Sequence, residues 1–499
     1  MTKSQQVRFN SRYVLTPLFA ALALSACGGS DNNNSSGTVT AGTVEVVRPQ
    51  DSRTFTPVAP TLNAMASIAG TPAVPETDRW VGVNKGASYA IEVPKNWNGM
   101  LVMYAHGYAG TGANLTAGPP AIRRHLISQG YAWAASSYSK NYYDVRAGVE
   151  DTNALALAFN DIAKTNGRTL VAPSKTYIIG VSMGGHITAA AVDEENIATA
   201  KNKFRYNGAV PMCGVLGDTE LFDYFTAYQL AAQKEAGIPA TSWPVTNWAD
   251  IQPQVLSKLF SSFPPTFTQT VPATPTAQGQ QLKIIVQNLT GGARPLFDVG
   301  YAGPYQNTVW GTFGSDGTIT GILNDRVVSS VNTVYQLDNN PAVSAAEQAY
   351  TDSMLKVTPV TDANRLRGDG LRWVPKTNAI ISVPVVTIHT LGDLYVPFSM
   401  EQIYKRRADK QGTSGLLVQR AIRGVAHCDF TFNEQAAAFD AMVNWEQKGV
   451  KPAGDDVLTP ATVADPKYGC KFSDNNFTQD DSAAIQAVRK NTAVIPSCS

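Results

Sequence analysis

The chain has 499 residues, and its 40 Lys and Arg stand against 39 Asp and Glu, so that the net charge at pH 7 is close to zero. Nucleic-acid binding needs a basic field that this balance does not supply, which excludes that class of partner. The length suffices for one large core with a substantial insertion, or for two to three smaller domains.

The N-terminus carries an export pattern. Basic residues precede an apolar segment that ends in a cysteine: Lys3, Arg8 and Arg12, then about Val14 to Leu24, then Leu24-Ser25-Ala26-Cys27. This pattern resembles a bacterial lipoprotein signal, which implies cleavage after residue 26, a lipid on the Cys27 sulfur and a polar tether over residues 27–55. By similarity to other lipoproteins, Gly28 rather than Asp at the next position favours anchoring in the outer membrane over retention in the inner membrane. An ordinary cleaved secretory signal is the alternative.

From about Ala87 the chain alternates strand-like and helix-like patterns. Strands are expected at residues 87–94, 100–107, 131–139, 176–181 and 207–214, and helices at residues 119–129, 149–164 and from about 186. Alternation of this kind predicts an α/β fold, with a mostly parallel sheet and helices on both faces. Residues 56–218 are therefore the expected first part of the core.

The alternation stops after Gly217. Residues 219–375 hold amphipathic and proline-rich pieces without a strand–helix repeat, which predicts an inserted domain. Strands are expected again near residues 383–390 and 416–422, followed by a helix over residues 432–449, so residues 376–450 form the second part of the core. Residues 451–499 are a polar tail.

One serine stands on the corner between a predicted strand and a predicted helix. Gly180-Val181-Ser182-Met183-Gly184 matches G-x-S-x-G, in which small residues permit a sharp turn that exposes the serine hydroxyl. The pattern alone is weak, and a serine on an ordinary turn is the simpler interpretation. Because the required strand precedes it and the required helix follows, we expect Ser182 to be a nucleophile.

A nucleophilic serine needs a base, and the chain has five histidines. His427 follows the last predicted strand on a loop, where an imidazole can reach the serine while another group orients it. The other four are His106, His125, His186 and His389. We expect His125 and His389 to be structural and His106 to shape a loop, while His186 could line the floor of the substrate pocket.

The carboxylate that orients the base is expected between serine and histidine in chain order. Asp393 directly follows the strand of residues 383–390, which places it at the same sheet edge as Ser182 and His427. Glu401 and Asp429 are the alternatives, and a loop aspartate often only caps a turn.

Backbone N–H donors are expected to face the developing oxyanion. One is the amide of Met183, and the other lies in the glycine-containing loop of residues 106–110, with Tyr108 as the candidate.

These residues and their order resemble the α/β-hydrolases. The resemblance covers residues 87–217 and 376–450, and it implies the α/β-hydrolase fold with Ser182, His427 and Asp393 as nucleophile, base and acid, and with Gly180 and Gly184 framing the nucleophile. We expect the insertion to lie over the sheet edge as a cap on the pocket. It does not specify the substrate, since this fold hosts esterases, lipases and peptidases.

Four cysteines remain after Cys27: Cys213, Cys428, Cys470 and Cys498. An even number in an exported chain predicts two disulfides, of which three pairings are possible, and no spacing matches a zinc site. His427-Cys428 also resembles the tannase and feruloyl-esterase branch, in which a cysteine beside the nucleophile pairs with the one after the histidine. Here Val181 precedes Ser182, so that bridge cannot form. Cys213 with Cys428 and Cys470 with Cys498 is the favoured pairing.

Aromatic residues are frequent in the insertion: Trp243, Trp248, Phe260, Phe263, Phe267 and Trp310. Each is expected in the core of the cap, and together they favour an apolar or aromatic substrate group. The sequence therefore predicts a serine esterase that needs no metal or other cofactor and is lipid-anchored at the membrane. A peptidase with the same residues and a non-catalytic binding lipoprotein are the alternatives.

Overall fold

The computed structural model describes residues 45, 47–59, 65–68, 74–263, 272–303, 305–314, 323, 326–340 and 342–498. The predicted signal segment, Cys27, most of the predicted tether and Phe267 lie outside these residues. The end of that tether is packed against the core, because the buried Arg48 forms an ion pair with Asp144 at 2.6 Å. Among the described residues, no helix is both long and apolar enough to span a bilayer.

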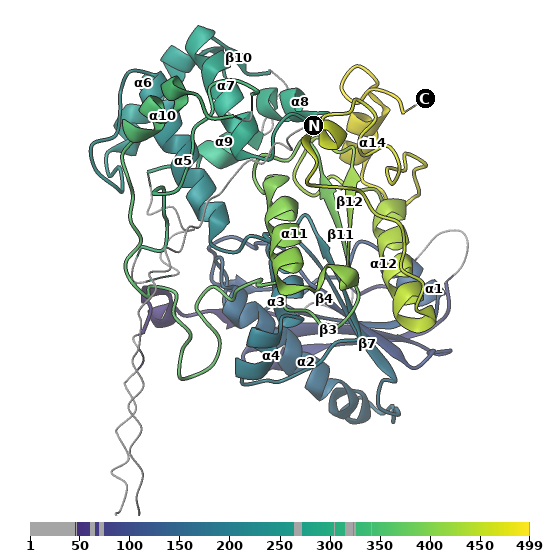
Figure 1. The fold of residues 1–499 in the computed structure, drawn as a ribbon. Coiled ribbons are helices and arrows are strands. Elements are labelled where there is room, and N and C mark those ends of the chain that lie inside the picture. The colour runs from purple at the N-terminus through teal and green to yellow at the C-terminus, as the bar shows by residue number, and fades with distance from the viewer. Residues whose placement is uncertain are drawn as a thin grey trace, which may run out of the picture.

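An eight-stranded sheet forms the centre of the molecule (Figure 1). In spatial order its strands are β12 (Leu417–Ile422), β11 (Val385–Thr390), β8 (Gly208–Met212), β7 (Lys175–Val181), β4 (Met100–Ala105), β6 (Ala132–Ser136), β3 (Ala87–Pro94) and β2 (Thr77–Asn84). Neighbours from β12 to β6 pair in parallel, and β3 is antiparallel to both β6 and β2. These strand orders and directions are those of the α/β-hydrolase fold, which confirms the predicted fold class.

Helices cover both faces of the sheet. One face packs against α2 (Val145–Thr165), α3 (Met183–Ala191) and α11 (Ser399–Gln411), and the other packs against α1 (Arg123–Ser128) and α12 (Phe432–Lys448). Successive residues of β7 point to opposite faces, so Ile178 joins the first core and Tyr177 and Ile179 join the second. Because both faces are buried, the central strands are apolar throughout rather than alternating.

Most predicted elements are present, with shifted ends. The helix expected over residues 149–164 starts four residues earlier, where the Asp144 side chain accepts a hydrogen bond from the Ala147 amide as an N-cap. The helix expected at residues 119–129 is only Arg123–Ser128. Strand β2 and helices α4 (Glu194–Thr199) and α11 were not predicted. The tail also contains α13 (Pro460–Val463) and α14 (Ala483–Lys490).

The predicted insertion is mainly helical. It contains α5 (Glu220–Glu235), α6 (Trp248–Leu259), α7 (Ala277–Leu289), α8 (Phe297–Ala302), α9 (Tyr305–Trp310) and α10 (Ala345–Asp352), with a small pair of strands, β9 (Phe260–Ser262) and β10 (Thr274–Pro275). A second short pair joins β1 (Thr56–Pro57) to β5 (Asn114–Leu115). Figure 1 shows the insertion's helices gathered together above the sheet. The exact domain boundaries stay a prediction.

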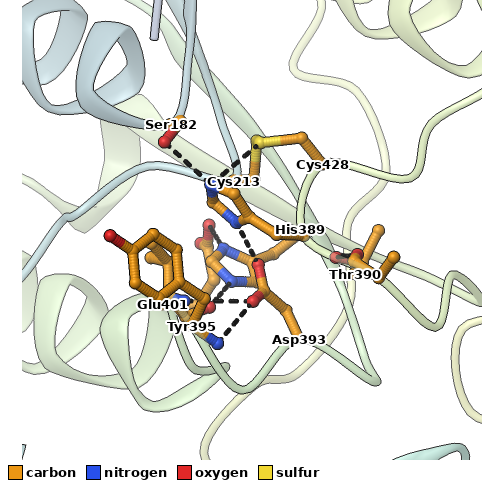
Figure 2. Close-up of a disulfide and its surroundings, with 11 residues drawn as sticks. Ser182, Cys213, His389, Thr390, Asp393, Tyr395, Glu401 and Cys428 are labelled. Carbon is orange, nitrogen blue, oxygen red and sulfur yellow. Dashed lines mark hydrogen bonds and ion pairs between the residues drawn. A yellow bond between two sulfur atoms is a disulfide. The ribbon is translucent and has the colours of Figure 1, made fainter. Parts of the chain in front are cut away.

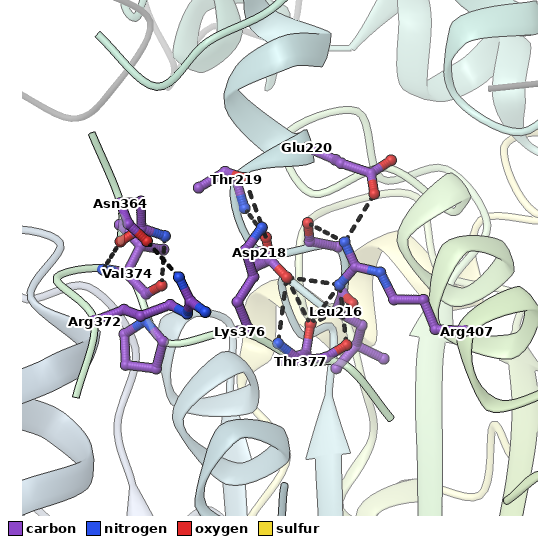
Figure 3. Close-up of polar contacts among 12 residues, drawn as sticks. Leu216, Asp218, Thr219, Glu220, Asn364, Arg372, Val374, Lys376, Thr377 and Arg407 are labelled. Carbon is purple, nitrogen blue, oxygen red and sulfur yellow. Dashed lines mark hydrogen bonds and ion pairs between the residues drawn. The ribbon is translucent and has the colours of Figure 1, made fainter. Parts of the chain in front are cut away.

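The two ends of the insertion meet at Asp218, which is fully buried (Figure 3). Its carboxylate accepts hydrogen bonds from Lys376 Nζ at 3.0 Å, Arg407 Nη1 at 2.6 Å and the Thr377 amide at 3.2 Å. Burial alone would raise the pKa of this carboxyl, but the charges of Arg407 and Lys376 outweigh it and hold the pKa well below the usual range. The charge at Asp218 therefore joins the chain leaving β8 to the chain returning toward β11.

We expect Asp218→Asn to lower the free energy of unfolding by about 3 kcal/mol at pH 7, because it leaves the Arg407 guanidinium without its buried counter-charge. A depressed carboxyl pKa stabilises the fold above the ordinary aspartate pKa, so this loss should shrink as the pH falls below about 4. Urea denaturation at several pH values measures both effects. Asp409→Asn, which removes the α11 surface pair with Lys405, is the matched control and should cost less than about 1 kcal/mol. Equal losses in the two variants would contradict this account.

Candidate active site

Ser182 lies on a strained turn between β7 and α3. Its φ of 57° and ψ of −122° are a conformation that non-glycine residues adopt at a cost of roughly 1–3 kcal/mol. A Cβ atom on Gly180 would lie 2.2 Å from the Gly184 carbonyl oxygen, and one on Gly184 would lie 2.0 Å from that of Ala105. Both glycines are therefore required sterically. The helix begins at Met183, three residues before its expected start, so the Met183 amide is at its free N-terminal end.

His427 lies on the loop between β12 and α12 and connects Ser182 to Asp393. The Ser182 hydroxyl lies 2.7 Å from His427 Nε2, and Asp393 Oδ2 lies 2.6 Å from Nδ1 (Figure 2). Because a carboxylate only accepts, Nδ1 carries the proton, and Nε2 is left free to accept from the serine. The structure thus joins the three residues that the sequence suggested in one chain of hydrogen bonds.

The Asp393 carboxylate is fully buried, and both of its oxygens accept hydrogen bonds. Its Oδ1 accepts hydrogen bonds from the amides of Tyr395 at 2.9 Å and Val396 at 3.0 Å, while Oδ2 accepts from His427. Three N–H donors therefore fix the direction of the carboxylate and, through it, the plane of the imidazole.

The two alternative carboxylates have other partners. Glu401 on α11 accepts from Thr387 Oγ1 at 2.6 Å and lies 3.3 Å from Nδ1 of His389. Asp429 accepts from the amide of Val425 at 3.1 Å, which closes the loop that carries His427. Neither carboxylate is bonded to His427 among the described residues, so Asp393 alone of the three occupies the orienting position.

Two of the remaining histidines are structural. His125 pairs with Asp440 at 2.8 Å. His389 lies fully buried in β11, where its Nε2 donates to the Val396 carbonyl at 2.8 Å. Burial acts to lower the pKa of His389, but the charge of the Glu401 carboxylate, 3.3 Å from Nδ1, outweighs it, so that the pKa is raised.

His186 does not line a substrate pocket, so that expectation was wrong. The side chain is fully buried in α3, accepts from the Tyr143 hydroxyl at 2.9 Å and donates to the Pro375 carbonyl at 2.8 Å. Burial lowers its pKa to about 4, so the ring is neutral at pH 7. One helical turn after Ser182, the His186 side chain points into the core. Its hydrogen bond to Pro375 fixes the C-terminal end of the insertion.

The loop after β4 passes beside the serine. A Cβ on Gly107 would lie 3.2 Å from the Ser182 Cβ, so only glycine permits this close approach without displacing a neighbour. His106 shapes the loop, since its ring stacks on Tyr138 at 4.1 Å between centroids and its carbonyl accepts from the Tyr138 hydroxyl at 2.9 Å. Tyr108 follows and is half-buried. The roles of the Met183 and Tyr108 amides as oxyanion donors stay predictions.

Both favoured disulfides are present. Cys213, directly after β8, is bonded to Cys428 with 5.3 Å between Cα atoms, and Cys470 is bonded to Cys498 with 5.5 Å. The Cys428 sulfur lies 3.5 Å from His427 Nε2 (Figure 2). Cys213, His427 and Cys428 are close enough together to suggest a metal site, but the two sulfurs are bonded to each other and offer no thiolate. The bridge ties the histidine loop to the strand next to the nucleophile strand.

Most of the insertion's aromatic side chains pack against one another. Trp310 is 1% exposed and has Trp248, Phe260, Phe263 and Phe313 within 6.1 Å between ring centroids. These rings form the interior of the insertion, so they give no support to an aromatic substrate.

Sequence reasoning missed the aromatic pair beside the base. Tyr395 places its ring edge-on to His427, 5.5 Å between centroids, and stacks at 5.7 Å on Phe225 of α5. The available signal was the position of Tyr395, two residues after the predicted acid.

The chain matches no protein-family model. It is 22% identical over 442 residues to an o-phthalyl amidase of Xanthobacter agilis, a match that covers 78% of this chain and 91% of the amidase.

The solved structures to which the chain is similar include two esterases and a peptidase, all with low TM-scores. Feruloyl esterase B from Aspergillus oryzae is 13% identical with a TM-score of 0.40, covering 78% of this chain and 86% of that one. A second A. oryzae esterase is 14% identical with a TM-score of 0.41, covering 80% and 86%. The Pyrococcus horikoshii acylaminoacyl peptidase is 10% identical with a TM-score of 0.36, covering 78% and 44%. Scores of this size carry no argument by themselves.

The strand order and the Ser–His–Asp geometry therefore define the class: the chain has the α/β-hydrolase fold. Together with the amidase relative, they support an enzyme of the hydrolase class that uses a serine.

We expect Cys213→Ser/Cys428→Ser to lower kcat/KM by roughly 10²-fold, because the imidazole loses the bridge that fixes its loop and small misplacements are costly. Steady-state kinetics with a p-nitrophenyl ester, beside thermal unfolding, measures this. Cys470→Ser/Cys498→Ser removes the bridge that does not touch His427 and should leave kcat/KM within a few-fold of the wild type. A folded, fully active Cys213→Ser/Cys428→Ser protein would show that the bridge does not position the base.

Proposed function

We propose that the protein hydrolyses carboxylic esters through an acyl-enzyme on Ser182. The observation that supports this most directly is the unbroken chain from Ser182 Oγ to His427 Nε2 and from Nδ1 to Asp393, with 2.7 and 2.6 Å between its heavy atoms. Such a chain turns a weak hydroxyl nucleophile into a competent one.

In the first half-reaction, His427 takes the hydroxyl proton as Ser182 attacks the ester carbonyl. The carbonyl oxygen becomes an oxyanion, for which we propose the amides of Met183 and Tyr108 as donors. His427 then gives its proton to the departing alcohol, and the acyl group stays on Ser182. Water repeats the sequence, which releases the acid and restores the serine. Asp393 remains ionised throughout and stabilises the imidazolium.

Amide hydrolysis is the second candidate, and the relative named o-phthalyl amidase favours it. The same residues serve, but an amine leaves only after protonation, so the amide reaction depends more strongly on His427 as an acid. An apolar or aromatic acyl group is proposed for either substrate. Its support is the Phe225–Tyr395 ring pair beside His427, rather than the buried aromatic interior of the insertion.

We also propose that residues 219–375 act as a cap over the site, and that the chain is exported and lipid-anchored at Cys27, in the outer membrane. The support for the anchor is the sequence pattern alone. Incorporation of labelled palmitate into the wild type, and its loss in Cys27→Ser, tests it. Equal labelling of the wild type and Cys27→Ser would contradict the proposed lipid anchor.

A fluorophosphonate should form one covalent adduct on Ser182, because a serine activated by its base attacks the phosphorus, fluoride leaves and the serine is phosphonylated. Intact mass and peptide mapping detect the adduct. Ser182→Ala should give none, and His427→Ala should react slower by roughly 10³-fold or more. No adduct on a folded protein with both disulfides formed would contradict the proposal and favour a binding protein.

A matched pair of substrates separates ester from amide hydrolysis. p-Nitrophenyl benzoate and the p-nitroanilide of benzoic acid share the acyl group and differ in the leaving atom. We expect kcat/KM for the ester to exceed that for the anilide by at least about 10²-fold, since only the amine needs full protonation to leave. A ratio near one would make amide hydrolysis the principal function. Turnover confined to aminoacyl anilides would favour a peptidase.

A further inference from the structure

The insertion holds the loop that carries Asp393 by its backbone. Arg294, between α7 and α8, donates from Nε to the Leu391 carbonyl at 2.8 Å, and the Tyr224 hydroxyl of α5 donates to the Leu394 carbonyl at 2.8 Å. At Gly300 of α8 the approach is so close that a Cβ would lie 2.0 Å from the Gly392 carbonyl oxygen. The insertion therefore contacts residues 391, 392 and 394, on both sides of Asp393.

Arg294 is a buried cation to which no carboxylate of the described residues is bonded. It is 6% exposed, and its Nη1 donates to the Gly292 carbonyl at 3.0 Å and Thr290 Oγ1 at 3.2 Å. Its Nη2 is buried with no hydrogen-bond partner, and no described carboxylate forms an ion pair with it. Burial lowers its pKa to about 10, which still leaves it charged at pH 7, and the negative charge of Asp393 opposes this lowering.

None of the other described groups around Asp393 supplies a positive counter-charge for its carboxylate. His427 faces it from the histidine loop and donates a hydrogen bond to it from Nδ1. His389 of β11 lies 3.3 Å from the Glu401 carboxylate of α11, which raises the His389 pKa, so this pair offers Asp393 no free positive charge. Burial raises the pKa of Tyr224 well above its usual value and that of Tyr395 to about 12, so both phenols are neutral. A buried carboxylate needs a counter-charge, and Arg294 is the one uncompensated cation among these described groups.

We infer that Arg294 is a positioning residue for the reaction, which holds the Asp393 loop by its guanidinium and supplies the long-range counter-charge for the Asp393 carboxylate. This inference rests on the proposed function, in which Asp393 orients His427. It has two consequences. First, the insertion helps to position the catalytic residues through the Asp393 loop. Second, the guanidinium charge opposes protonation of the His427 imidazole, so that His427 can act as a base at lower pH.

The test compares Arg294→Met with Arg294→Lys and Tyr224→Phe in the full-length protein. Arg294→Met removes the charge and the hydrogen bonds, so kcat should fall and the acidic limb of the pH profile of kcat/KM should move to higher pH by on the order of half to one unit. Arg294→Lys keeps the charge without the planar fork, and Tyr224→Phe removes one hydrogen bond without changing any charge. Both should lower kcat and leave the acidic limb in place.

The pH profile distinguishes this role from simple support, since a structural role lowers kcat without moving the limb. An unmoved limb in Arg294→Met, or an equal shift in Arg294→Lys, would overturn the inference. If Arg294→Met does not fold, Arg294→Gln also removes the charge, and the same shift of the acidic limb is expected of it. An unmoved limb in Arg294→Gln would then overturn the inference in the same way. Failure of the proposed function would be seen separately, as a wild-type protein with no fluorophosphonate adduct on Ser182.

Discussion

A buried negative charge at Asp393 is the constraint around which the site is organised. The carboxylate is removed from water, so it must find its stabilisation within the protein. Two backbone amides and the His427 imidazole supply it locally, and the Arg294 guanidinium is proposed to supply it at longer range. Each of these contacts also limits how the acid can move. The same bonds that make burial tolerable therefore aim the carboxylate at the imidazole.

The three residues of the hydrogen-bond chain come from separate parts of the sequence, and each is held differently. Ser182 is fixed by a strained turn between glycines, Asp393 by the backbone of its loop and by the insertion, and His427 by the bridge from Cys428 to Cys213. The two ends of the insertion are held together by the hydrogen bonds that Lys376 and Arg407 donate to Asp218. Strain and buried charge at the site are compatible with a stable protein because the surrounding hydrophobic core is large.

The sequence predicted the features that depend on local pattern and chain order. G-x-S-x-G between a strand and a helix located Ser182, and the order of loops after parallel strands located Asp393 and His427, because such loops meet at one sheet edge. The direction of individual side chains was harder to predict from the sequence. His186 points into the core, and Trp248 and Trp310 pack inside the insertion. The contacts of Arg294 and Tyr224 with residues 391 and 394 join segments far apart in sequence, and no local pattern encodes them. Helix α11 was missed because its charged residues give little apolar periodicity.

The most direct test of the account compares two buried carboxylates. The rate constant for fluorophosphonate labelling of Ser182 should fall by about 10⁴-fold in Asp393→Asn, because the imidazole loses its tautomer and orientation. In Glu401→Gln it should stay within about tenfold of the wild type, since Glu401 bonds to His389 and not to His427. Near-normal labelling in Asp393→Asn, or a large loss confined to Glu401→Gln, would contradict the assignment of Asp393 as the acid.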